Sequence, residues 1–349
     1  MRLEPIPNPT ITRRLGLPGL AMGMTVVIAS SLALLAGADP FSVLGLIIEG
    51  AVGSKFALLE TLNRATPLIF TGLAVAVAFR AKLWNIGAEA QLYAGALVTV
   101  LLGTGFLPWP TYALLPVIII ASMLAGAALL LGPAWLKTRL GVDEVVTTLL
   151  LNFIMLLIIS MLLEGPLKDP MGMGWPKSPR LIEEARLPRI IEGLRIHWGF
   201  GLALIAAGVV WVIDARSTLG FEMRAVGQNQ RAAQFAGIPV NLVILKTALL
   251  SGGLAALAGF SEVAGLKGNL TLDLSPGFGY TGIIVAMLAL LHPAGVVASA
   301  IFVAAVFVGA DSMSRAAGVP TYIADILLAT ALLLMVLAIM LTRFRIVRD

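Results

Sequence analysis

A short polar stretch interrupts the apolar sequence at residues 79–91, which read FRAKLWNIGAEAQ. Asn85, Glu89 and Gln91 follow closely on two cations, Arg80 and Lys82. A carboxylate near the start of a helix is favoured by the helix dipole, so Glu89 could cap a helix and pair with Arg80 or Lys82. If the flanking runs cross a membrane, the same polar groups could instead line a solute path, because ionisable groups at that depth tend to face cavities. The residues alone leave both interpretations open.

A second polar interruption, residues 214–239, carries the signals of a short helix. Asn229 can cap its start, Gly237 can end it in the left-handed conformation, and Pro239 prevents its continuation. We therefore expect a helix over residues 230–237. A helix of about two turns is too short to persist alone in water. It must pack either on the chain's own inner surface or on a partner in the cytosol.

The side chains that catalysis or metal binding would need are missing. The chain has no cysteine, which excludes a disulfide framework and a thiolate nucleophile. No Gly-Lys dipeptide occurs, so the phosphate-binding loop of an ATPase is absent. The two histidines, His197 and His292, are far apart and form no zinc pair. We expect no catalytic residue, no metal site and no cofactor.

The composition is that of a membrane protein. Apolar residues make up 59% of the chain and charged residues 12%, and the mean hydropathy is +0.97. A soluble domain would carry about 25% charged residues, so the natural solvent of this chain is the lipid bilayer. The net charge of +5 is interpreted as the Lys and Arg bias of cytoplasmic loops. A nucleic-acid surface is not expected, because no basic patch interleaved with aromatic residues occurs.

Windows of about 20 apolar residues predict an all-α, polytopic transmembrane helix bundle, with residues 1–349 as a single transmembrane domain. His292-Pro293 should end the eighth window, because proline cannot donate the bond that a continuing helix needs. We expect about ten spans, near residues 17–36, 61–79, 86–103, 112–131, 145–163, 198–213, 240–264, 280–291, 295–310 and 322–341.

The distribution of Lys and Arg orients the bundle. With both termini cytoplasmic, most of the 24 Lys and Arg residues fall on inner segments, as the positive-inside rule requires. Residues 164–198 then form an external loop, and residues 214–239 form a cytoplasmic loop. The external loop is rich in proline and long for a connection, so it is either a surface that receives another protein or a solvated cap.

Two segments of the chain echo each other. Residues 71–76 read TGLAVA and residues 281–286 read TGIIVA. Transporters often carry internal repeats, with the substrate path where the repeats meet. Ser251, Ala255 and Gly259 form a row of small residues at four-residue spacing, which allows helices to approach closely in lipid.

The stretch at residues 79–91 resembles a signature of permease subunits from ABC importers of the nucleoside and simple-sugar class, the systems served by basic-membrane-protein-type binding lipoproteins. That signature reads Phe-Arg-x-x-x-Phe-Asn-Ile-Gly-Ala-Glu-Gly-Gln, and the chain departs from it with Trp84 and Ala90. Residues 224–238 resemble the same family's cytoplasmic element, Arg-Ala-Val-Gly-x-Asn-x-x-Ala-Ala-x-x-Ala-Gly-Ile. Residues 280–286 also fit, so the likeness covers most of the chain. The chain lacks the Ile-Asp-Leu-Ser-Val-Gly element of the ribose-type branch, which favours nucleosides.

The resemblance implies a permease that moves nucleosides or related small solutes inward across a bacterial-type inner membrane. It implies a second permease subunit, identical or different, with separate ATP-binding subunits in the cytosol and a substrate-binding lipoprotein or periplasmic protein outside. ATP hydrolysis would belong to the partner, so the chain itself would not be an enzyme. In that scheme the helix of residues 230–237 docks into the ATPase through Arg231, Ala232, Ala233, Phe235, Ala236 and Gly237.

Three other functions are compatible with a polytopic helix bundle. A simple sugar could replace the nucleoside as substrate. An ion-coupled secondary transporter would use Glu89, Glu262 or Asp325 to carry a proton, but an autonomous carrier would not need the structured inner loop. A polytopic enzyme acting on a lipid-linked substrate is disfavoured by the missing catalytic residues.

Overall fold

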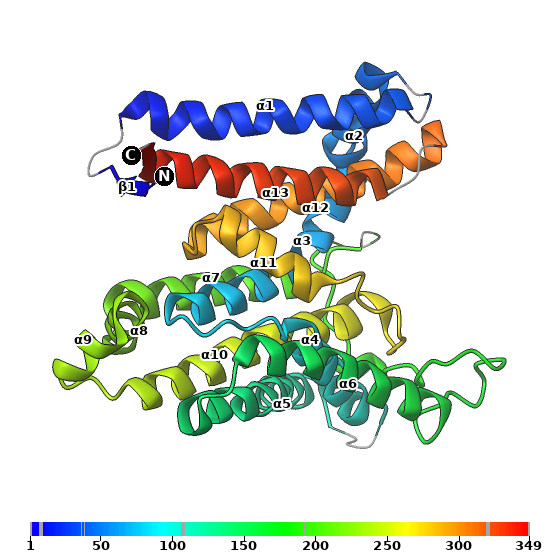
Figure 1. Ribbon diagram of the computed structural model, residues 1–349. Helices are drawn as coiled ribbons and strands as arrows, with labels where there is room; N and C mark the ends of the chain where they lie inside the picture. Colours follow the sequence, from blue (N-terminus) through cyan, green and yellow to red (C-terminus); the bar gives the residue numbers. More distant parts are fainter. Residues whose placement is uncertain are drawn as a thin grey trace. The chain divides into compact units, whose positions relative to one another are not determined.

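The computed structural model is built almost wholly from helices (Figure 1). It describes residues 2–6, 10–35, 37, 39–105, 109–191, 193, 195–318 and 322–347. The chain divides into two compact units, a terminal unit (Met1–Thr61 and Phe302–Asp349) and a central unit (Leu62–Ile301). The boundaries fall within α3 (Lys55–Arg80) and α12 (Pro293–Ala317).

The terminal unit brings the two ends of the chain together. Helix α1 (Ile11–Leu35) lies beside α13 (Tyr322–Arg343) (Figure 1). Strand β1 (Arg2–Pro5) pairs antiparallel with β2 (Phe344–Val347), so the termini share one end of this unit. Helix α2 (Pro40–Val52) was not expected from the sequence, although Asp39 before it is an N-cap signal. The carboxylate of Asp39 accepts a hydrogen bond from the Ser42 amide at 2.8 Å.

The central unit is organised around α10, which packs along both α4 and α5. A Cβ on Gly259 of α10 would lie 1.9 Å from the carbonyl oxygen of Leu92, so this contact requires glycine. The expected row of small residues on α10 is therefore a packing surface. The helices of this unit after α3 are α4 (Ala88–Gly103), α5 (Thr111–Leu140), α6 (Glu144–Glu164), the 3-10 turn η1 (Glu183–Ala185), α7 (Trp198–Arg216), α8 (Thr218–Gln228), α9 (Gln230–Phe235), α10 (Val240–Ser261) with its π-helical continuation η2 (Glu262–Lys267), and α11 (Phe278–Leu288).

Each of the ten expected spans coincides with a helix, but the number of spans is not confirmed. Six of the described helices are long and apolar enough to cross a membrane: α3, α5, α6, α7, α10 with η2, and α12. Helix α4 has 16 residues and α11 has 11. At about 1.5 Å per residue they rise only about 24 and 16 Å, less than the roughly 30 Å of a bilayer's hydrocarbon core. Both are half-helices, since each starts among buried residues inside the unit.

The expected cytoplasmic loop of residues 214–239 is mostly helical. It holds the end of α7, the whole of α8, which the sequence did not predict, and α9. Asn229 caps α9 as expected, because its side-chain oxygen accepts hydrogen bonds from the amides of Arg231 and Ala232 at 3.0 and 3.1 Å. Gly237 has a φ of +83°, the left-handed conformation expected at the end of this helix.

Candidate functional site

Residues 81–87 lead from the end of α3 back into the central unit, where their polar groups form a closed network. Asn85 Nδ2 donates to Gln91 Oε1 at 3.0 Å, and Gln91 Nε2 donates to Asn85 Oδ1 at 2.9 Å. Asn85 Nδ2 also donates to Ser251 Oγ at 3.0 Å, and that hydroxyl donates to the carbonyl of Ala74 at 2.7 Å. Asn85, Gln91 and Ser251, which we call the amide cluster, are all buried. The cluster therefore ties α3, α4 and α10 together.

Glu89 joins the two half-helices. It lies in the first turn of α4, and its Oε2 accepts a hydrogen bond from the amide of Gly279, in the first turn of α11, at 2.6 Å. A Cβ on Gly279 would lie 2.2 Å from the backbone nitrogen of Glu89, so the two helix starts are in direct contact. The N-terminal ends of two helix dipoles thus meet at one carboxylate, which both dipoles favour. Expecting Glu89 near a helix start was correct, but its partner is the second half-helix.

Asn152 and Thr148 of α6 hold the other side of residues 81–87, which form the break between α3 and α4. Asn152 Oδ1 accepts from the amide of Ala90 at 2.9 Å, and its Nδ2 donates to the carbonyl of Ile86 at 2.9 Å and to the Tyr280 hydroxyl at 3.0 Å. Thr148 Oγ1 accepts from the amide of Ile86 at 3.2 Å. These residues were not predicted from the sequence. The signal that could have found them is their spacing, because Thr148 and Asn152 lie four residues apart on one face of a largely apolar helix.

Arg80 secures the end of α3 without touching Glu89. Its Nη1 pairs with Asp214 at the end of α7, and its Nε and Nη2 donate to the carbonyl of Leu291 at 3.2 and 2.9 Å. Leu290 and Leu291 have φ values of 51° and 62°, a costly conformation outside glycine. The guanidinium supports this turn at the C-terminal end of α11, where a cation is favourable. The Glu89–Arg80 pair considered from the sequence is therefore not formed.

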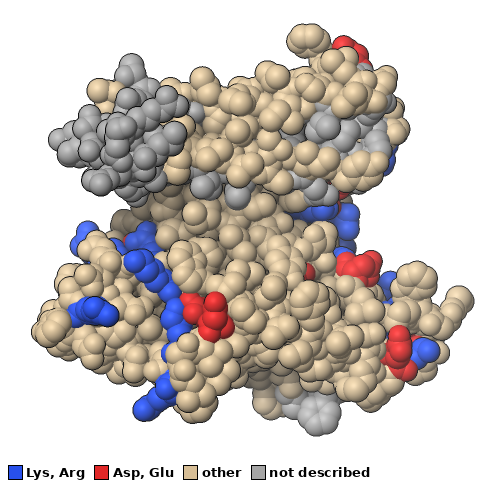
Figure 2. Space-filling model, in the orientation of Figure 1, with Lys and Arg blue, Asp and Glu red and all other residues tan. Residues whose placement is uncertain are grey.

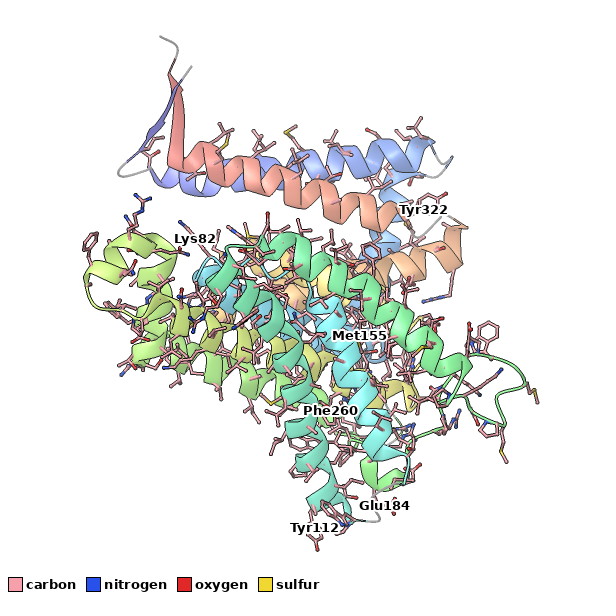
Figure 3. All side chains as sticks on the ribbon, turned by 60° about the horizontal axis from the view of Figure 1, so that its bottom comes forward. Lys82, Tyr112, Met155, Glu184, Phe260 and Tyr322 are labelled. Atoms are coloured by element: carbon pink, nitrogen blue, oxygen red, sulfur yellow. The ribbon has the colours of Figure 1, made fainter. Side chains whose placement is uncertain are left out.

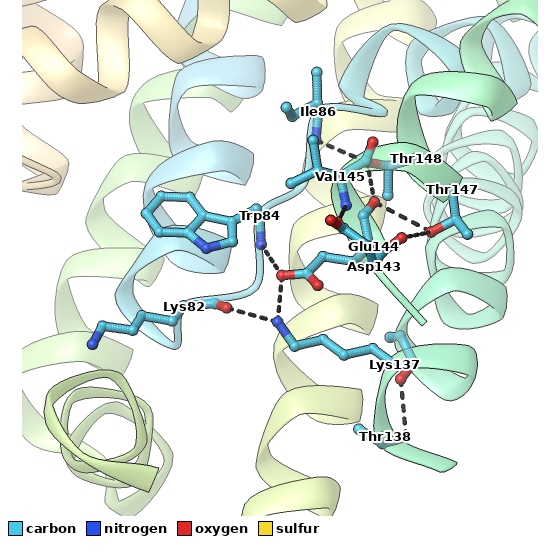
Figure 4. Close-up of polar contacts among 11 residues, drawn as sticks. Lys82, Trp84, Ile86, Lys137, Thr138, Asp143, Glu144, Val145, Thr147 and Thr148 are labelled. Atoms are coloured by element: carbon cyan, nitrogen blue, oxygen red, sulfur yellow. Dashed lines mark hydrogen bonds and ion pairs between the residues drawn. The ribbon is translucent and has the colours of Figure 1, made fainter. Parts of the chain in front are cut away.

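Lys137 and Glu144 extend this polar end of the unit, as Figure 4 shows. Lys137 Nζ pairs with the carboxylate of Glu144 and donates to the carbonyl of Lys82 at 3.0 Å. Glu144 in turn accepts from the amide of Trp84 at 3.2 Å. Arg224 of α8 pairs with Asp214 at 3.0 Å. Segments far apart in the sequence, all expected on the inner side, thus meet at one end, and Figure 2 shows Lys and Arg gathered around α8 and α9.

Helix α9 presents a mostly exposed surface at this end. Phe235 is 94% exposed and Ala232 is also exposed, whereas Ala233 is only 4% exposed and faces the chain's own interior. Arg231, Ala236 and Gly237 are exposed. A cavity of about 670 Å³ adjoins α9 and is lined in part by Arg139, Arg231 and Gln234.

The described part of residues 164–198 folds onto the opposite end of the central unit. The amide of Leu181 donates to the carbonyl of Gly268, and that of Ile182 to the carbonyl of Gly103, both at 2.9 Å. His197 caps α7 by accepting the Gly199 amide on Nδ1 at 3.1 Å, and its burial lowers its pKa to about 4. In Figure 3, Lys82 lies at one end of the unit and Glu184 at the other. The two predicted loops therefore lie at opposite ends.

The two similar six-residue segments, 71–76 and 281–286, contact each other in the structure. A Cβ on Gly72 of α3 would lie 2.7 Å from a methyl carbon of Val285 in α11, and a Cβ on Gly282 would lie 2.7 Å from Thr71. Each segment thus contributes a glycine that lets the other approach. This contact is a structural reason for both segments to carry the same Thr-Gly pair.

Comparisons with known proteins identify the family of the chain. Residues 57–339 match the family described as the branched-chain amino acid transport system permease component. The chain is 35% identical to the glucose ABC transporter permease protein of Haloferax volcanii, over 95% of this chain and 87% of that protein. It is 36% identical to the guanosine ABC transporter permease protein of Bacillus subtilis, over 90% and 89%. A nucleoside ABC transporter permease protein of Lactococcus lactis is 28% identical over 91% and 89%. The chain belongs to this permease family, and it is a multi-pass membrane permease of an ABC transporter.

Proposed function

We propose that the chain imports nucleosides across a bacterial-type inner membrane, energised by ATP hydrolysis on a separate subunit. The observation that carries this proposal is the 36% identity to a guanosine permease along nearly the whole length of both chains. The Asn-Ile-Gly-Ala-Glu stretch at residues 85–89, buried at the start of α4, supports it. A simple sugar is the second candidate, because the glucose permease relative is almost equally similar.

The proposed assembly has partners on both sides of the membrane. The termini and the α8–α9 end, where Arg80, Lys137 and Arg224 gather, would face the cytosol, as expected for cation-rich ends. The opposite end would face a substrate-binding protein. A cavity of about 530 Å³ at that end, lined in part by Glu183, Arg186 and Arg189, offers charged groups for such a contact. A second permease subunit would complete the transporter.

Helix α9 is proposed to dock into the ATPase and to transmit its motion. Phe235 is the anchor, because an aromatic side chain left 94% exposed is a typical hot-spot residue of an interface. Arg231, Ala232, Ala236 and Gly237 flank it on the exposed surface. Ala233 would act differently, by seating α9 on the chain itself, since it is buried. Arg80 and Asp214 connect the base of this region to the break at residues 81–87.

Asn85, Glu89 and Gln91 are proposed to lie beside the translocation route and to tune transport. They hold the place where α4 and α11 begin, and transporters bind substrates at such broken helices. Their own hydrogen bonds go to neighbouring helices, so they would act on transport by fixing the shape of the break. The ion-coupled alternative would instead need Glu89, Glu262 or Asp325 to exchange protons; the side chain of Asp325 lies outside the described residues.

Uptake by proteoliposomes tests this function. The permease, its partner permease and the ATPase are reconstituted, and the binding protein is added outside with radiolabelled guanosine or glucose. We expect guanosine uptake that requires both ATP inside and the binding protein outside. Uptake driven by an ion gradient without ATP would overturn the importer proposal. Uptake of glucose alone would keep the importer and replace the substrate.

A further inference from the structure

Asn63 of α3 differs from every polar residue of the break described above. Its side chain is 2% exposed, and both its Nδ2 and Oδ1 are buried without a hydrogen-bond partner among the described residues. The amides of Asn85, Gln91 and Asn152 are all bonded to the chain. A buried amide without a partner destabilises a fold, because it gives up its bonds to water and gains none. Such a group requires an explanation, and a visiting polar ligand is one.

The backbone carbonyl of Asn63 also lacks one of the usual helical hydrogen bonds. Pro67 lies four residues further along α3 and has no N–H to donate to the Asn63 carbonyl. The side chain of Asn63 therefore has no hydrogen-bond partner among the described residues, and its carbonyl lacks the usual donor four residues further along the helix. Free backbone groups within membrane helices are tolerated where they line a cavity or are satisfied by another group.

The residue after Asn63 contacts the start of the second half-helix. The guanidinium carbon of Arg64 lies 5.9 Å from the ring centroid of Phe278, the first residue of α11. The next residue, Gly279, is the one that Glu89 holds. A guanidinium and an aromatic ring thus meet where α11 starts against α4, and Asn63 is the residue that precedes this guanidinium in α3. The amide donates and accepts hydrogen bonds, as hydroxyls and base edges require, and a guanidinium stacks on flat rings.

We propose that Asn63 and Arg64 contact the solute during its passage, with Asn63 bonding to hydroxyl groups or to the polar edge of a ring. This inference rests on the proposed function and names a contact site for the same substrate class, a nucleoside or a sugar. The amide cluster fixes the break, whereas the Nδ2 and Oδ1 of Asn63 are available to form hydrogen bonds with the solute. In the described conformation Asn63 is closed off, so the solute reaches it when the helices part.

The test compares Asn63→Leu with Asn85→Leu, two replacements of a buried amide by an apolar side chain of similar size. If Asn63 serves the solute, Asn63→Leu gives folded protein at wild-type abundance, with a melting temperature equal to or above wild type. Stimulation of the ATPase by the loaded binding protein is retained, but solute uptake per ATP hydrolysed falls roughly tenfold, as expected when hydrogen bonds to the solute are lost. Asn85→Leu instead lowers the melting temperature.

Two outcomes would overturn the inference. Unchanged uptake per ATP in Asn63→Leu would mean that the amide does not meet the solute, whatever the melting temperature. Loss of folding as severe as in Asn85→Leu would make Asn63 a structural residue. The wild-type protein, measured in the same preparation, distinguishes a failure of the proposed function from a failure of the inference on Asn63. A wild type that moves neither guanosine nor glucose refutes the proposed function, whereas an active wild type with an equally active Asn63→Leu refutes this inference alone.

Discussion

The break at residues 81–87 with the first turn of α4, and the helix α9, are both marked in the sequence by polar or small residues, yet they have opposite roles in the structure. At the break, Asn85, Glu89 and Gln91 are buried and their bonds go to the chain itself. On α9, Phe235 and Ala232 remain exposed. A buried side chain whose hydrogen bonds all go to the chain itself contributes mainly to stability, whereas an exposed side chain is available to a partner. Substitutions in the two regions should therefore separate stability from assembly.

The largest expected effect on stability belongs to Asn85→Leu. The change leaves the buried Gln91 amide without its partner and removes a donor to Ser251. Unpaired buried polar groups cost about 1–3 kcal/mol each, so the free energy of unfolding should fall by about 2–4 kcal/mol. Thermal unfolding in detergent measures it. A melting temperature unchanged from wild type would show that the amide cluster does not hold the break.

His197 should make stability depend on pH, because its buried ring must stay neutral. Its pKa is about 4 in the fold and about 6.5 in the unfolded chain, so the unfolded state alone takes up a proton as the pH falls between these values. Stability is therefore fully present above pH 6.5 and is lost as the pH falls towards 4. The loss should be on the order of 1–2 kcal/mol between pH 7 and pH 5.

Melting curves at several pH values measure this loss, with His197→Asn as the matched control. Asparagine is a good N-cap residue and does not titrate, so it should keep the bond to the Gly199 amide and flatten the pH dependence in this range. An equally steep dependence in His197→Asn would assign the effect to another group.

Glu89→Gln should have a smaller effect on stability and should change transport. Glutamine can still accept the Gly279 amide bond but removes the charge that two helix N-termini favour, which should cost about 1 kcal/mol. If Glu89 shapes the route, uptake per folded molecule changes several-fold. Lower stability with wild-type uptake would restrict Glu89 to a structural role. Wild-type values for both measurements would refute both roles.

Single cysteines should report the orientation of the two ends without affecting stability. The chain has no native cysteine, and Gln228 and Glu184 are exposed at the expected inner and outer ends. In cells with a permeabilised outer membrane, an impermeant maleimide should label Glu184→Cys and spare Gln228→Cys. Labelling of Gln228→Cys alone would invert the proposed topology.

The sequence predicted the helical elements well and their contacts poorly. The cap at Asn229 and the left-handed Gly237 are local, so the residues themselves determine them. The partner of Glu89 is 190 positions away at Gly279, and no local pattern encodes it. Apolar windows also cannot distinguish a span from a half-helix, because α4 and α11 are as apolar as the spans. The unpartnered amide of Asn63 becomes visible only when every buried polar group is followed to its bonds.

Phe235→Ala tests most directly the claim that this permease is coupled to its ATPase through α9. Phe235 is 94% exposed, so its truncation should leave the fold of the permease intact. Loss of a hot-spot aromatic costs about 2 kcal/mol or more, about 30-fold in affinity. Phe221→Ala, which removes an exposed aromatic from α8, is the matched control. Each variant is purified with its tagged ATPase, and co-elution, membrane abundance and uptake are measured. We expect Phe235→Ala at normal abundance with little bound ATPase and little uptake, and Phe221→Ala near wild type. An abundant Phe235→Ala that retains the ATPase and transports normally would contradict the account.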